Sequence, residues 1–139
     1  MDPQATVDTS KNKNAILYYN KAKKLFENTD NARGYALLCN YLGDYYRKEK
    51  DLKLANEYYT KSLNLYEELQ NKFGASLSLY NIAGLLQDQK KYKEAREATE
   101  KTVELSKKTG DKKAQILGLI DLGKIDRTSG DSINADKNF

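Results

Sequence analysis

The chain has 139 residues, enough for one domain, and 32% of them are charged. Its 24 basic and 20 acidic residues are interspersed, so the net charge of +4 forms no large field of one sign. A single Cys excludes an internal disulfide, and no apolar run is long enough to span a bilayer or to act as a signal peptide. This polar composition fits an elongated stack of helices, in which each unit touches only its neighbours.

The pattern of apolar residues predicts helices along nearly the whole chain. Residues 1–11 are polar and contain the only proline, and we interpret them as a disordered leader or an expression remnant. Apolar side chains then recur at helical spacing. The predicted helices cover, in chain order, residues 12–28, 32–48, 52–70, 72–89, 92–108 and 112–128, and a seventh follows Asp131. Period-two alternation, the signal of strands, is absent.

Asparagine and aspartate residues mark where several of these helices begin. The side chains of Asn31, Asp51, Asp111 and Asp131 can each accept a hydrogen bond from the first turn of the helix that follows. These helix starts divide the chain into units of similar length.

Equivalent residues recur 40 positions apart, which predicts a helical repeat array. The clearest sets are leucines and small residues: Leu37, Leu77 and Leu117; Gly43, Ala83 and Gly123; and Ala15, Ala55, Ala95 and Ala135. We therefore predict one repeat domain over residues 12–139. It consists of a partial repeat (12–31), two full repeats (32–71 and 72–111) and a second partial repeat (112–139).

The stretch LGDYYRKEKDLKLANEYYTKSLNLY resembles a tetratricopeptide repeat (TPR). Leu42, Gly43 and Tyr46 resemble the first helix of that motif, and Ala55 and Tyr59, together with Ser62, resemble the second. The stretches NIAGLLQDQKKYKEA and KKTGD resemble the longer variant of about 40 residues found in kinesin light chain, spindle-orientation adaptors and bacterial peptide-sensing regulators. The resemblance implies an all-α, right-handed superhelix of antiparallel helix pairs, with about seven helices.

Small residues are expected where the helices cross, and leucine and tyrosine side chains are expected to fill the space between them. Three positions depart from the pattern: Thr99 replaces an aromatic ring, Asp126 replaces an apolar residue, and Ser132 stands at the position of Leu52 and Tyr92. The array begins on a second helix and ends inside another. We therefore expect either that the chain is a piece of a longer protein or that a partner, including a second copy, covers its ends.

Catalysis, cofactors and metal binding are not expected. The chain has no His to serve as a base, and no nucleophile motif or metal-ligating cluster is apparent. Lysine clusters fall at helix ends and are interrupted by acidic residues, so nucleic acid is not an expected partner. The lone Cys39 lies on an apolar stripe and is expected to be buried. We expect a cytoplasmic protein.

The resemblance implies that the first helix of each unit lines a concave groove. Residues at i, i+4 and i+7 share one stripe of a helix. This reasoning selects ten candidate groove residues: Asn40, Tyr41, Asp44, Arg47, Tyr80, Asn81, Gln87, Asp121, Lys124 and Arg127. Asn81 resembles the asparagine that, in the long-repeat adaptors, binds the backbone of a bound peptide, since an amide both donates and accepts.

The predicted function is a non-catalytic protein-interaction module that holds a partner peptide in the groove, within a larger adaptor or scaffold. The Lys and Asn clamp by which some TPR domains bind chaperone tails is missing, because Asn40 and Asp44, then Tyr80 and Gly84, occupy those positions. The alternative is the peptide-sensing repeat region of a bacterial signalling protein or transcription regulator. Self-association through the open ends is a further prediction.

Overall fold

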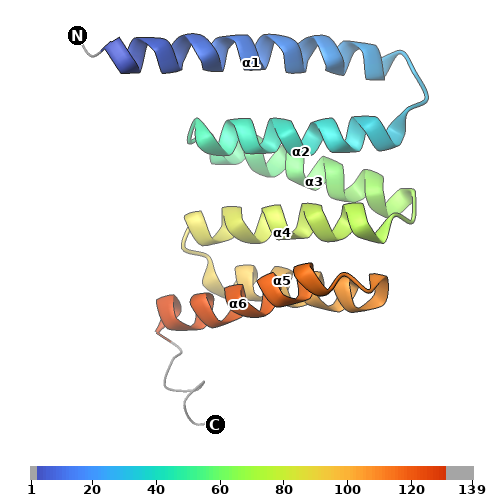
Figure 1. Cartoon of the computed structure of the whole chain (residues 1–139), viewed down its shortest axis with the longest axis vertical. Helices are drawn as coiled ribbons and strands as arrows, with labels where there is room; N and C mark the ends of the chain where they lie inside the picture. Colours follow the sequence, from blue (N-terminus) through green and yellow to red (C-terminus); the bar gives the residue numbers. More distant parts are fainter. Residues whose placement is uncertain (1–2, 131–139) are drawn as a thin grey trace.

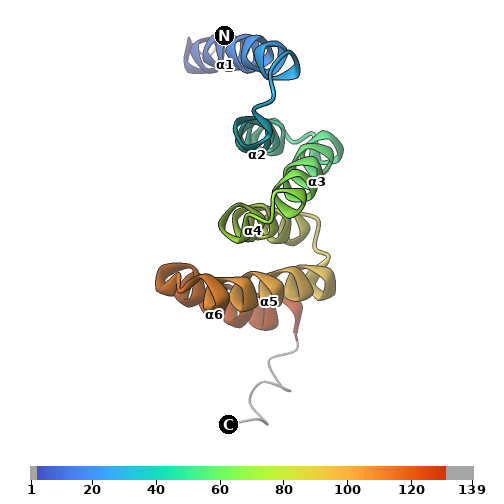
Figure 2. The same cartoon turned by 90° about the vertical axis from the view of Figure 1, so that its right-hand side faces the viewer.

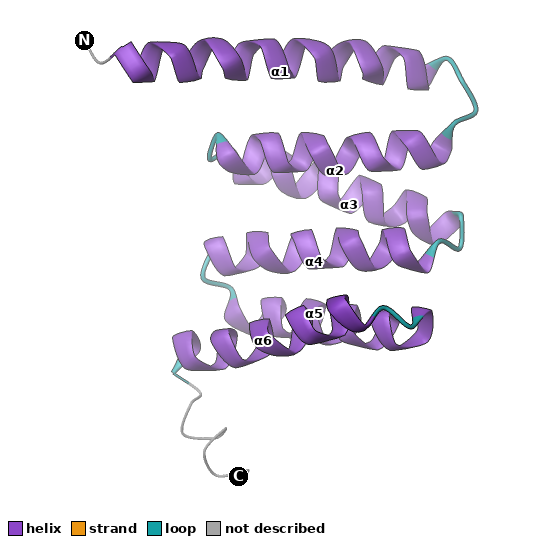
Figure 3. Ribbon diagram, in the orientation of Figure 1, coloured by secondary structure: helices purple, strands orange, loops and turns teal. Residues whose placement is uncertain are grey.

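In a computed structural model, residues 3–130 form six helices and no strand (Figures 1 and 3). Side chains are described from Lys13 onward. The helices are α1 (Pro3–Glu27), α2 (Ala32–Lys48), α3 (Leu52–Glu68), α4 (Lys72–Asp88), α5 (Tyr92–Thr109) and α6 (Lys112–Ser129). The predicted all-α, TPR-like fold is thereby confirmed for the described part of the chain.

The helices form a stack in which each helix packs on the next one in the chain, and α2 also contacts α4 directly. Figure 1 shows the stack from α1 at one end to α6 at the other. Figure 2, turned by 90°, shows α2 and α4 on one side and α3 on the other. Because α2 and α4 contact each other, the first helices of successive repeats form a layer of their own.

Side-chain caps explain why four of the helices begin where they do. The side-chain oxygen of the residue before the helix accepts a hydrogen bond from a backbone N–H of the first turn, which otherwise has no partner. The N···O distances are 2.9–3.2 Å at Asn31, Asp51, Asn71 and Asp111. Three of these caps were expected from the sequence, and Asn71 is an additional one.

The turns that end the helices lie 20 residues apart, and this spacing produces the 40-residue period. The left-handed conformation is taken by Lys50, Gln70 and Lys90 after α2, α3 and α4, and by Gly110 and Gly130 after α5 and α6. A residue in this conformation reverses the chain and satisfies the last carbonyl groups of the helix. Each turn therefore redirects the chain at an equivalent position.

Small residues lie at the helix crossings, as expected. Ala55 and Ala95 are fully buried, and Tyr59 fills the space against α2. A Cβ added at Gly43 would collide with the Tyr59 ring, so only glycine permits this approach. The equivalent Gly123 on α6 has no atom within 4 Å of such a Cβ among the described residues.

Two of the three residues that depart from the repeat pattern are accommodated by hydrogen bonds, and the third, Ser132, lies outside the described residues. The hydroxyl of Thr99 donates to the backbone oxygen of Ala95 at 2.8 Å, which satisfies it in the interior. Asp126 accepts a hydrogen bond from Arg96 of α5 and forms an ion pair with it. The charge of Asp126 is thus compensated within the chain.

The first helix begins earlier than expected, at Pro3 rather than at residue 12. No glycine or second proline interrupts this stretch, and proline is favoured in the first turn of a helix because its fixed φ suits that position. The predicted seventh helix, with Asp131, Ala135 and Phe139, lies outside the described residues. Within residues 3–130 no helix combines the length and the apolar composition needed to cross a membrane.

Candidate functional site

A hollow of about 180 Å³ brings together residues from α2, α4 and α6, which are the first helices of their repeats. It is lined by Arg47 of α2, by Tyr80, Gly84, Gln87 and Asp88 of α4, and by Asp121 of α6. Four of these six residues are candidate groove residues from the sequence: Arg47, Tyr80, Gln87 and Asp121. The hollow therefore joins α2, α4 and α6 along one surface.

Arg47 is held across this surface by Asp88. Its Nε and Nη2 donate to the two carboxylate oxygens at 2.5 and 3.1 Å, and these hydrogen bonds raise the pKa of Arg47 above its ordinary value. A Cβ at Gly84 would come within 2.7 Å of the guanidinium, so glycine leaves room for it. The Arg47 charge is thus already paired, and an incoming acidic group would share it with Asp88.

Asp44 is tied to the neighbouring helix. The hydroxyl of Tyr59 donates to Asp44 Oδ1 at 2.5 Å. Burial and this carboxylate raise the pKa of Tyr59. Asp44 itself is exposed.

Asn40 is not on the groove surface, contrary to the expectation from its spacing. It is 3% exposed, and its Nδ2 donates to Ser78 Oγ at 3.2 Å. Ser62 lies 3.0 Å from the same hydroxyl. The physical reason is that a short amide at this position meets the hydroxyl of Ser78, which Ser62 also contacts, and so becomes part of a buried polar network between α2, α3 and α4.

Asn81, the residue expected to contact a peptide backbone, lies at the edge of this network. Its Nδ2 donates to Asn40 Oδ1 at 3.3 Å, and the side chain is half-buried. No partner for its Oδ1 is found among the described residues. The amide is therefore fixed in orientation by Asn40 while its oxygen remains an acceptor.

The remaining candidates are exposed but do not line the hollow. Tyr41 is 48% exposed and stacks on Tyr19 of α1, with ring centroids 6.5 Å apart. Lys124 and Arg127 are exposed on α6 and form no ion pair within the described part of the chain. The structure thus separates these three residues from the central set around Tyr80.

An exposed row of leucines on the same helices was missed by the sequence reasoning. Leu37, Leu77 and Leu117 are 39%, 44% and 40% exposed, although we expected such positions to fill the interior. The signal was present, because the three leucines are 40 residues apart. A repeat period shows that positions are equivalent, but it does not show which side of the helix they face.

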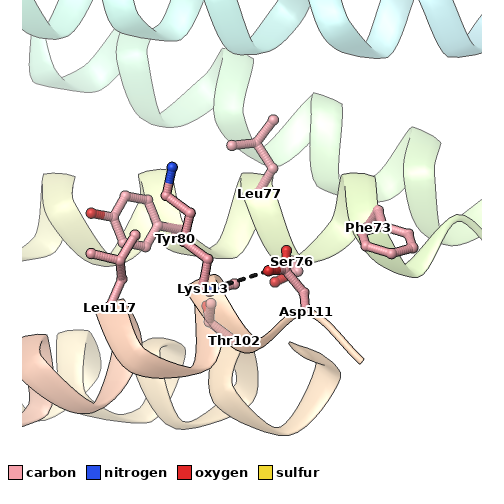
Figure 4. A pocket seen from close by; sticks show the side chains of 9 residues that line it. Phe73, Ser76, Leu77, Tyr80, Thr102, Asp111, Lys113 and Leu117 are labelled. Carbon is pink, nitrogen blue, oxygen red and sulfur yellow. Dashed lines mark hydrogen bonds between the residues drawn. The ribbon is translucent and has the colours of Figure 1, made fainter. Parts of the chain in front are cut away.

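Two hollows border this row. The first, of about 230 Å³, lies between α4 and α6 and is lined mainly by apolar side chains, including Leu77, Tyr80 and Leu117. Figure 4 shows Leu77 and Tyr80 projecting from α4, and Leu117 from α6. The second hollow lies between α2 and α4, where Leu37, Phe73 and Leu77 line it. Tyr80 also lines the polar hollow beside Arg47, so the apolar and polar hollows adjoin at this residue.

The side chains of this surface are suited to binding. Among the described residues, no group of three or more His, Cys, Asp or Glu side chains is placed to hold a metal ion. Burial raises the pKa of the Cys39 thiol to about 11, which opposes formation of a thiolate. An apolar row beside paired charges is typical of protein-interaction surfaces.

The fold and this surface define the class as a TPR-like helical repeat protein of the protein-interaction type. Residues 1–113 match the family described as SNAP, soluble NSF attachment protein. The chain belongs to this family, which is an adaptor-type, non-enzymatic helical family. The match supports the TPR-like repeat in general rather than its longer variant. A search of curated proteins gives no match.

Proposed function

We propose that this chain is a cytoplasmic adaptor that holds a segment of a partner protein along α2, α4 and α6. The observation that carries the proposal is the position of Tyr80, which lines both the apolar hollow beside Leu117 and the polar hollow beside Arg47. One extended surface therefore offers both an apolar floor and hydrogen-bonding groups, which is what a peptide segment requires.

Each part of the surface has a role in this proposal. The leucine row takes apolar side chains of the partner, and Tyr80 supplies an aromatic anchor that is already 39% exposed. Asn81 Oδ1 accepts a backbone N–H, since its amide group is oriented by Asn40. A micromolar complex requires about −8 kcal/mol, which a few such anchors can supply.

The family description indicates the type of molecular role. A soluble NSF attachment protein is, by that description, a soluble protein that attaches NSF. We propose the same type of role for this chain: it links one protein to another and acts on neither chemically. The identity of its partner would follow from capture and cross-linking.

The test uses two substitutions of equal exposure. Leu77→Asp changes the groove, while Leu69→Asp changes the end of α3, and both leucines are 44% exposed. A partner captured from the source lysate by cross-linking and mass spectrometry is titrated against the wild type and both variants. We expect the affinity to fall at least about tenfold for Leu77→Asp, because a buried charge would replace an apolar contact.

The control decides how the result is interpreted. Leu69→Asp should retain wild-type affinity, and circular dichroism should show equal helix content for all three proteins. Equal affinity of Leu77→Asp and wild type would move the interface away from the groove and overturn the proposal.

A further inference from the structure

The hollow between α2 and α4 lies away from both ends of the stack, and we call it the central hollow. Its volume is about 550 Å³, within the range of about 300–1,000 Å³ that is typical of ligand sites. Its apolar part consists of Leu37, Phe73 and Leu77, of which Phe73 is the most exposed, at 59%. Apolar surface that is gathered in a hollow in this way marks a site where a partner can bind.

One wall of the central hollow is a packed aromatic ring. Tyr66 of α3 contributes this ring and is buried. A Cβ at Gly74 would collide with it, so glycine lets the ring pack directly against α4. Burial raises the pKa of Tyr66, and the charge of Arg33, which also lines the hollow, opposes this rise. A partner side chain therefore meets a close-packed surface with a cation beside it.

The polar side chains of the central hollow offer hydrogen-bond donors. The Oδ1 atoms of Asn31 and Asn71 each accept a hydrogen bond from the backbone in the first turn of α2 and of α4, at 2.9 and 3.0 Å. Their Nδ2 groups, for which the described residues provide no partner, are left as donors. Arg33 adds a guanidinium, and none of the described residues that line the hollow is Asp or Glu. The hollow is therefore rich in donors and carries a positive charge.

Arg33 differs from the other arginines of helices α2 to α5, because its charge is not compensated. Arg47 forms an ion pair with Asp88, and Arg96 forms one with Asp126. Arg33 is exposed and forms no ion pair with any residue whose side chain the structure describes. The surface between α2 and α4 thus has a neutralised cation at the end of α2 and an uncompensated one at its start.

We propose that the partner segment carries an acidic side chain next to an apolar one, and that these two side chains occupy the central hollow. This inference rests on the proposed function and specifies the chemistry of the partner. The apolar side chain packs between Leu37, Phe73 and Leu77, and the carboxylate binds the guanidinium of Arg33. A carboxylate only accepts hydrogen bonds, so it complements donors that lack a partner. A basic side chain would instead meet Arg33 with like charge, which opposes binding.

The two parts of this contact act differently. The apolar side chain contributes affinity, because its burial removes apolar surface from water. The carboxylate contributes orientation, since Arg33 lies in the first turn of α2 and the neutralised Arg47 lies in its last turn. The acidic residue of the segment therefore lies at the edge of the stack that carries the α3–α4 turn (Figure 1).

The test selects binders from a library of random peptides whose C-termini are joined to the carrier, so that every carboxylate is a side chain. Selection uses the full chain as wild type, Arg33→Glu and Lys53→Glu, and keeps only peptides whose binding is lost with Leu77→Asp. Lys53→Glu is the matched control, because Lys53 is the second residue of α3, as Arg33 is of α2, is also exposed and does not line the central hollow. We expect wild type and control to enrich Asp or Glu next to an apolar residue, and Arg33→Glu to enrich Lys or Arg there.

A peptide selected on wild type then tests the charge pair directly. Arg33→Glu should weaken its binding at least about tenfold, and exchanging the acidic residue of the peptide for Lys should restore it. Circular dichroism should show equal helix content, since Glu is favourable in the first turn of a helix.

The remaining outcomes separate this inference from the proposed function. Peptides that depend on Leu77 but show no acidic preference, or that lose affinity equally with Lys53→Glu and Arg33→Glu, would overturn the inference and leave the groove as the binding site. A library that yields no peptide dependent on Leu77 would overturn both.

Discussion

Gly43 and Gly123 occupy the same repeat position in different surroundings, and alanine at each should have opposite effects on stability. In both helices alanine improves on glycine by about 0.5–1 kcal/mol, because glycine loses more backbone entropy on folding. At Gly123 this gain is unopposed within the described part of the chain, where a Cβ meets no atom within 4 Å. We therefore expect Gly123→Ala to raise the free energy of unfolding by about 0.5–1 kcal/mol.

At Gly43 the same gain is outweighed by a clash. The added Cβ would lie too close to the ring of Tyr59, which is fully buried and cannot move into solvent. Overpacking of this kind costs about 1–3 kcal/mol. The net effect is a loss of up to about 2.5 kcal/mol, and the two variants should differ by about 1–3 kcal/mol.

The assay is urea unfolding followed by circular dichroism at low micromolar concentration. Equal slopes against urea for the variants would show that the same surface unfolds. If Gly43→Ala is as stable as Gly123→Ala, the Tyr59 ring does not fill the site at Gly43. The argument from helix crossing would then be refuted.

Three further predictions concern the interior and the groove. Ser78→Ala should lower stability by about 1–3 kcal/mol, measured by urea unfolding, because the buried amide of Asn40 loses its partner. Stability should fall as pH rises above about 9, because the folded pKa of Cys39 is raised to about 11 and the unfolded thiol loses its proton first. Alkaline melting curves should show the effect, and Cys39→Ala should reduce it. Asp88→Asn should cost no more than about 1 kcal/mol, because Arg47 and Asp88 are 34% and 39% exposed; a larger loss on melting would contradict this.

The sequence predicted the number and order of the described helices because helix caps and apolar spacing are local signals. Asn31, Asp51 and Asp111 cap the helices that they were expected to cap. The 40-residue period also located the crossing positions, since only small residues such as Ala55 fit there. Local chemistry and repeat equivalence were sufficient for this level of structure.

The candidate site was predicted less completely because it depends on contacts between repeats. The stripe containing Asn40 was identified, but burial of that amide depends on Ser62 and Ser78, which belong to other helices. Leu37 was expected in the interior and is exposed, because helical spacing alone does not distinguish the groove side of a helix from its core side. Information about the neighbouring helix was needed in both cases.

The pattern of contacts between helices implies that resistance to local unfolding is graded along the stack. Helix α1 packs mainly on α2 and touches α3 only through Lys23 and Tyr58, whereas α4 is held by α2, α3 and α5. Backbone amides of α4 should therefore exchange with solvent deuterium most slowly, and those of α1 and α6 should exchange fastest. In such a chain, opening proceeds inward from the ends, and the central helix pair retains its structure after the outer helices have been released.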